Sequence, residues 1–299
     1  MSRETERFFR EFAKATEGKK FKGEEEIQEY MEKFMKEYKE SVEKEDRPFD
    51  AFDYLEMAED AINGKEAIHY AKKALELDPY LLDADLIIAH EKSHNTEEFK
   101  KKLKALIKKG EIRLLEQGIS KEEDEGSFYS IHETRPYMRL RKEYVDILIA
   151  QGKFRLAISE IEEMIRLNES DNLGLRYILV ALYSYFEDED RAVALYKKYT
   201  EDTAFMLLPL IALYYKMEDD KKMRTYIRKL KKWNPEVLKA LELFIDENED
   251  GEKEIEDIVF STKYRLASAE EVVLAIMQSS FLYVPMNEFV ERMVREFGN

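Results

Sequence analysis

The chain has 299 residues, no cysteine and a formal net charge of −16 at pH 7. Without cysteine it forms no disulfide bond, binds no metal through thiolates and carries out no thiol catalysis. The negative charge repels a phosphate backbone, so we expect no direct binding to nucleic acid. The longest apolar run, 205–215, is too short to cross a bilayer, and the N-terminus lacks an apolar signal segment. We therefore expect a cytoplasmic protein without membrane contact.

Helical periodicity of apolar residues runs along the whole chain and divides it into three parts. Residues 1–45 predict an N-terminal segment of two amphipathic helices. Residues 46–240 predict a repeat domain, in which a polar, acidic stretch near 118–130 indicates an exposed insertion, either a flexible loop or a lid. Residues 241–299 predict capping helices that follow an acidic linker over 246–254.

His90, Glu91 and His94 form an H-E-x-x-H pattern, in which two histidines one helical turn apart bind zinc and the glutamate acts as general base. That chemistry needs both histidines on one face of a continuous helix. Here Asn95–Thr96 predicts a turn and a new helix start directly after His94. The position where a third ligand is expected holds Leu114. A zinc-dependent hydrolase is therefore the alternative function and not the favoured one.

The segment His132–Arg139, HETRPYMR, is the most individual part of the chain. Thr134 can cap the following helix, and Pro136 suits its first turn, where no amide donor is needed. These structural roles leave four residues unexplained. We treat them as a motif of unknown role: His132, Glu133, Arg135 and Tyr137.

Within 137–235 one pattern of small and apolar residues comes round three times. The anchors of the three units follow one another after 35 and 31 residues: Ala157, Ala192 and Met223. Each unit has an apolar residue nine positions earlier, in its first helix: Leu148, Tyr183 and Tyr214. A period of about 34 residues built from two antiparallel helices is that of tetratricopeptide repeats. One hairpin cannot bury its apolar face alone, whereas stacked hairpins can.

The pattern therefore predicts an all-α fold: a right-handed superhelix of antiparallel helix hairpins, a tetratricopeptide-like solenoid with extra N- and C-terminal helices. A helical bundle without repeats is the alternative. Pro209 predicts that the helix over 205–215 starts late or bends. The seven cations within 221–233 favour a solvated face that complements the protein's own acidic segments, with an acidic partner or phosphate as the alternative.

The runs ETRPYMR, GKFRLAI and RLNESDNLGLRY resemble an uncharacterised family of bacterial tetratricopeptide-repeat-like proteins. The resemblance covers roughly residues 50–241. It implies the fold, and it brings no activity, substrate or partner. The chain departs from the family pattern at Glu169–Ser170, where the family has Pro-Asn.

In stacked hairpins of this kind the first helices line the concave side. On this register the groove presents aromatic and charged side chains: Arg139, Lys142, Asp146, Arg176, Tyr177, Tyr185 and Tyr215. Aromatic rings offer broad contact area, and cations can hold a carboxylate on a peptide. Alternatively, several of the tyrosines pack between hairpins, and Arg176 pairs with acidic residues around Asp171.

The sequence thus favours a non-catalytic scaffold that binds a protein or peptide through the concave surface of a helical repeat, with no cofactor. It identifies neither the partner nor the oligomeric state.

Overall fold

The structure, a computed structural model, describes residues 3–16, 18–42, 48–245, 249–261, 264–286 and 288–298. Helices dominate this part of the chain, which contains no β-strand, so the all-α expectation is confirmed. Contacts divide the chain into two units, Met1–Ser170 and Asp171–Asn299. The boundary between them falls inside the predicted repeat domain. None of the described helices combines the length and the apolarity needed to cross a membrane.

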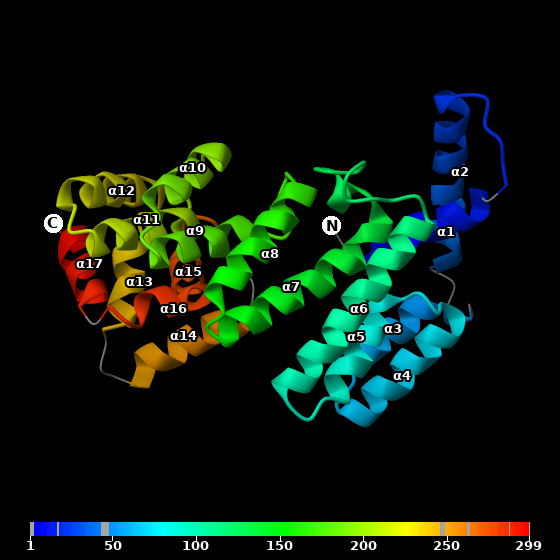
Figure 1. The fold of residues 1–299 in the computed structure, drawn as a ribbon, viewed down its shortest axis with the longest axis horizontal. Helices are drawn as coiled ribbons and strands as arrows, with labels where there is room; N and C mark the ends of the chain where they lie inside the picture. The colour runs from blue at the N-terminus through cyan, green and yellow to red at the C-terminus, as the bar shows by residue number, and fades with distance from the viewer. Residues whose placement is uncertain are drawn as a thin grey trace. The chain divides into compact units, whose positions relative to one another are not determined.

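The first unit is drawn from blue to green in Figure 1. Its α-helices and two short 3₁₀ turns are α1 (Arg3–Thr16), α2 (Glu24–Val42), α3 (Ala51–Glu59), α4 (Gly64–Leu77), α5 (Leu82–Glu91), α6 (Thr96–Glu116), η1 (Phe128–Ser130), η2 (His132–Thr134), α7 (Arg135–Ala150) and α8 (Phe154–Leu167). Helices next to each other in the sequence, from α3 to α8, pack against each other. The unit therefore contains three successive helix pairs: α3 with α4, α5 with α6, and α7 with α8.

Small residues set how closely these helices approach. Ala71 and Ala74 of α4 are fully buried in the cluster that α4 shares with α3 and α5. Gly110 of α6 faces Leu82 and Tyr137, and a β-carbon there would lie 3.0 Å and 3.2 Å from their side chains. Both neighbours are buried, so α6 can approach α5 and α7 this closely only because position 110 has no side chain.

The second unit contains α9 (Leu175–Tyr185), α10 (Glu189–Tyr199), α11 (Ala204–Lys216), α12 (Asp220–Trp233), α13 (Val237–Leu243), α14 (Glu249–Ser261), α15 (Ala269–Gln278), α16 (Ser280–Tyr283) and α17 (Phe289–Gly298). Helix α11 is buried from Ala204 to Tyr214. Figure 1 shows α10 and α12 on one side of α9 and α11, and α13, α15 and α16 on the other. A helix that is apolar all round is stable in such a central position. Pro209 lies inside α11, which starts at Ala204, so the expected late start is wrong.

The same turn joins the helices of three successive pairs. The second-last residue of each turn has a left-handed backbone: Gly152, Glu187 and Glu218, with φ of 66°, 59° and 58°. The next amide in each case donates to a carbonyl five residues back: Lys153 to Leu148, Asp188 to Tyr183 and Asp219 to Tyr214. This is the amide-to-carbonyl pattern of a helix C-cap in which a left-handed residue follows the helix. The three acceptors are the residues that the sequence aligned nine positions before the anchors.

A buried carboxylate joins helix ends within the second unit. Glu271 of α15 is fully buried and accepts hydrogen bonds from the backbone amides of Ala204, 2.7 Å away, and Ala267. Ser268 caps α15 by accepting from the Glu271 amide, and its carbonyl accepts from the buried Asn234 side chain at 2.8 Å. The starts of α11 and α15 and the end of α12 are therefore held by one polar network.

Two segments differ from the sequence prediction. The acidic linker expected over 246–254 is helical from Glu249 onward, while 246–248 lie outside the described residues. Acidic side chains suit the first turn of a helix, so a charged stretch is no proof of a linker. The expected exposed insertion is anchored at its end: Phe128 is 1% exposed, and the Gly126 amide donates to the Arg166 carbonyl at 3.1 Å.

Replacing Glu271 by Ala leaves two amides without their acceptor in a dry environment. The free energy of unfolding is expected to fall by about 2–4 kcal/mol, because a buried unsatisfied donor costs about 1–3 kcal/mol. Urea denaturation measures the loss. The neighbouring, half-exposed Glu270→Ala is the control, with an expected loss below about 1 kcal/mol. Equal losses in the two variants would contradict the assigned role of Glu271.

Candidate functional site

The zinc-type pattern does not lie on one helix. Helix α5 ends at Glu91, and α6 starts directly after His94 as predicted, with Asn95 as its capping residue, so His94 lies in the connection between them. His90 is exposed and contacts the ring of Phe99 edge-on at 5.2 Å. Within the described part of the chain, no group of three or more His, Asp or Glu side chains is arranged to hold a metal ion.

Three predicted groove residues belong to α7 of the first unit. Arg139 binds Glu6 of α1 at 2.7 Å and Asp83 of α5 at 2.7 Å, and both carboxylates are less than 9% exposed. Lys142 and Asp146 form a half-exposed ion pair with each other at 2.6 Å. Arg139 thus connects three helices of its own unit, whereas Lys142 and Asp146 remain accessible.

The other four predicted groove residues belong to the second unit. Arg176 binds Asp171 at 2.9 Å and Glu201 at 3.1 Å. This agrees with the alternative interpretation, in which Arg176 pairs with acidic residues around Asp171. The Tyr177 hydroxyl donates to Glu201 at 2.8 Å, and burial together with this hydrogen bond raises its pKa. Tyr185 and Tyr215 are half-buried.

Aromatic partners of these tyrosines also lie in the second unit. Tyr185 contacts the ring edge of Phe281, and Tyr215 that of Phe289. The alternative that some of these tyrosines pack inside the protein is therefore realised in part. A groove that the residues of both units share stays a prediction.

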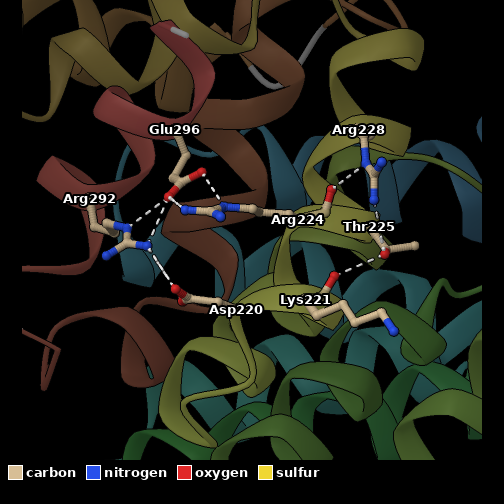
Figure 2. A network of polar contacts seen from close by, with 7 residues as sticks. All are labelled: Asp220, Lys221, Arg224, Thr225, Arg228, Arg292 and Glu296. Carbon is tan, nitrogen blue, oxygen red and sulfur yellow. Dashed lines mark hydrogen bonds and ion pairs between the residues drawn. The ribbon is translucent and has the colours of Figure 1, made fainter.

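The basic helix α12 finds several partners within its own unit. Figure 2 shows Glu296 of α17 between Arg224 of α12 and Arg292, with donor–acceptor distances of 3.0 and 3.1 Å to their Nε atoms. Lys222 binds Glu189 of α10 at 2.7 Å. The expected match between this helix and the protein's own acidic residues is thus present at these two positions.

The motif of unknown role has two halves. Arg135 and Tyr137 are 1% exposed and pack against Tyr129 and Phe128, so they anchor the end of the insertion. Thr134 occupies the N-cap position of α7, as predicted, but its side chain makes no capping hydrogen bond. Its hydroxyl points to the carbonyls of Ile131 and Phe128 instead.

The other half of the motif reaches an open space. His132 stacks on Phe9 of α1, with ring centroids 4.0 Å apart. His132, Glu133 and Pro136 line a cavity of about 640 Å³ in the first unit. This volume lies in the range of about 300–1,000 Å³ that is typical of ligand sites.

Five segments of the first unit form the cavity: α1, Phe52 of α3, the stretch 77–83 from the end of α4 to the start of α5, the C-terminal part of α6, and η2 with the start of α7. Charged residues line it, among them Glu6, Arg10, Asp78, Asp83, Arg113 and Glu133. Apolar and aromatic residues line it too, among them Phe52, Leu77, Tyr80, Leu114 and Pro136. Leu77 and Tyr80 are 55% and 51% exposed, so apolar surface faces the solvent here.

Comparison with protein-family models finds no match, and comparison with curated proteins finds none either. The site is therefore interpreted from its own chemistry.

Sequence reasoning identified the motif but missed the residues opposite it. Arg10 lies in a predicted amphipathic helix, and Arg113 lies in a helix rich in lysine, where no local signal separates it from solvent-exposed cations. Only the fold brings Arg10, Asp78 and Arg113 to one cavity.

Replacing Arg139 by Met removes the cation that two buried carboxylates share. The free energy of unfolding is expected to fall by about 3 kcal/mol or more, because breaking a buried ion pair leaves an uncompensated charge. The matched control on the same helix is Lys142→Met, whose half-exposed pair contributes about 0–1 kcal/mol. Urea denaturation distinguishes them, and similar losses in both variants would contradict the role given to Arg139.

We expect His132 to make the docking of α1 sensitive to pH. Its Nδ1 is buried without a hydrogen-bond partner, and burial, followed by the nearby Arg135, lowers its pKa, while Glu133 and Glu6 act in the opposite direction. A depressed histidine pKa gives stability that is fully present above the unfolded value of about 6.5 and is lost as the pH falls below it.

The urea concentration at the midpoint of unfolding is therefore expected to be lower at pH 5.5 than at pH 7.5. His132→Phe keeps a ring against Phe9 but does not titrate, so its midpoint is expected to fall less. An equal fall in both proteins would show that His132 is not responsible.

Proposed function

We propose that the protein is a non-catalytic scaffold of the tetratricopeptide-like type that binds a protein or peptide segment. The repeated turn with its left-handed residue in three successive helix pairs supports the repeat assignment. The resemblance to the uncharacterised bacterial family that carries the ETRPYMR motif points to the same fold. The half-exposed Lys142, Tyr185 and Tyr215 are retained as proposed contacts of the concave surface.

The observation that carries the proposal is the cavity of the first unit. Five separate segments, one of them containing the motif, bring exposed apolar surface and charged groups together there. Such a mixture suits a peptide, which offers apolar side chains together with polar groups.

The aliphatic hydroxyl in the walls of the cavity is not arranged as an activated nucleophile. Among the described lining residues, Thr16 has the aliphatic hydroxyl, and this hydroxyl donates to the carbonyls of Phe12 and Ala13 at 2.8 and 3.0 Å. A nucleophile needs a base within hydrogen-bond reach, and Thr16 instead makes backbone contacts within its own helix.

Retention of peptides by the immobilised full-length protein tests the proposal. The probe is a pool of N-acetylated random hexapeptides with free carboxyl ends, and mass spectrometry identifies those retained. Ala13 is exposed and lines the cavity, so Ala13→Trp is expected to abolish retention by filling the space with a large side chain.

Ala150→Trp is the matched control, because Ala150 is exposed at the end of α7 and lines neither this cavity nor the neighbouring hollow that contains Tyr80 and Arg113. It is expected to retain the same peptides as the unaltered protein. The proposal fails if the unaltered protein retains none, or if Ala13→Trp retains the same set.

A further inference from the structure

Among the described residues that line the cavity, one cation, Arg113, and one carboxylate, Glu133, have no ion-pair partner. Glu6 and Asp83 share Arg139, and Asp78 binds Arg10 at 2.8 Å. Arg113 forms no ion pair with any carboxylate in the part of the chain that the structure describes. Arg10 and Arg113 therefore line the same cavity. Among the described residues, Asp78 is the one carboxylate that forms an ion pair with either arginine.

Arg113 is nevertheless held in a fixed position. Its guanidinium lies 4.1 Å from the centre of the Tyr80 ring, and Nη1 donates to the Tyr80 carbonyl. The other guanidinium N–H groups of Arg113 have no acceptor among the described residues. An arginine stacked on an aromatic ring in this way is pre-organised to bind an acidic group through its remaining donors.

The surroundings of Arg113 destabilise its positive charge despite the two nearby carboxylates. Burial lowers the pKa of Arg113 and repulsion from Arg10 adds to this effect, while Asp78, Tyr80 and Glu133 act in the opposite direction. A positive group whose charge is destabilised by its surroundings gains from an added anion.

The neighbouring groups narrow the class of anion. Asp78 and Glu133 add two negative charges to the same cavity, and these repel a dianion such as phosphate more strongly than a monoanion. The exposed Leu77 and Tyr80 line the same cavity as Arg113 and offer contact to an apolar group. A carboxylate with an apolar neighbour, as on a peptide, fits both features.

We propose that Arg113, with Arg10 beside it, binds a carboxylate of the peptide segment, and that Leu77 and Tyr80 contact an apolar residue next to this carboxylate. The inference rests on the proposed peptide-binding function and names the group that the cavity recognises. The carboxylate belongs either to the end of the segment or to an Asp or Glu side chain.

Three pools of N-acetylated hexapeptides separate these sources on the immobilised full-length protein. The first lacks Asp and Glu and has a free carboxyl end, the second lacks Asp and Glu and is amidated, and the third contains Asp and Glu and is amidated. Retention of the first or third pool without the second is expected, and it identifies the source. Inorganic phosphate is expected to compete no better than chloride at equal ionic strength.

The decisive variant is Arg113→Met, which keeps an unbranched apolar stem and removes the guanidinium with its charge. For the peptide retained best, its Kd, measured by fluorescence anisotropy, is expected to rise about tenfold or more, because hydrogen bonds to charged groups contribute about 1.5–3 kcal/mol. Arg113→Lys is expected to lose less. Lys101→Met on the same helix is the matched control, since Lys101 is exposed and lies outside the cavity, and its Kd is expected to be unchanged.

The outcomes separate the two proposals. Retention of the amidated pool without acidic residues as strongly as the others overturns the carboxylate inference and leaves the peptide-binding function standing. The same conclusion follows if Arg113→Met, with an unchanged thermal unfolding midpoint, binds as tightly as Lys101→Met. If the unaltered protein retains none of the pools, both proposals fail.

Discussion

The first unit depends on one guanidinium placed between two buried carboxylates. Arg139 of α7 binds Glu6 of α1 and Asp83 of α5, and so connects elements that are 133 and 56 residues apart in the sequence. Both carboxylates are almost fully buried, so either of them would cost free energy of folding if it lost its ion pair with the arginine. This cost favours the docking of α1 at this place. The docked helix then supplies Arg10 and Phe9 to the cavity region, where Arg10 binds Asp78 and Phe9 stacks on His132.

Much of the fold could be predicted because it follows from local periodicity. The aligned positions Leu148, Tyr183 and Tyr214 all accept the same capping hydrogen bond, so the sequence register corresponds to equivalent turns. The glycine signal was present in only one of the three turns, because Glu187 and Glu218 adopt the left-handed backbone without a glycine. Helix α14 was not predicted, because its acidic residues were interpreted as a linker. Acidic residues also suit the first turn of a helix.

The candidate site could be predicted only in part. Its motif was identified because His132 and Glu133 break the repeat pattern. The same pattern does not distinguish Arg135 and Tyr137, which are buried, from the neighbouring residues that line the cavity. Arg139 was expected to face a peptide, yet its long-range partners Glu6 and Asp83 take up its charge. Pairings over such sequence distances leave no local trace, and for the same reason Arg113 could not be distinguished from the surrounding lysines.

These contacts give the first unit a charged and partly apolar cavity, and we propose that a peptide segment binds there. Hydrogen exchange of the full-length protein, with and without a saturating retained peptide, tests this claim most directly. The account expects slower exchange in α1, around 77–83 and around 110–117, the backbone segments that form the cavity. Protection confined to residues 171–299, or no protection in the presence of bound peptide, would contradict it.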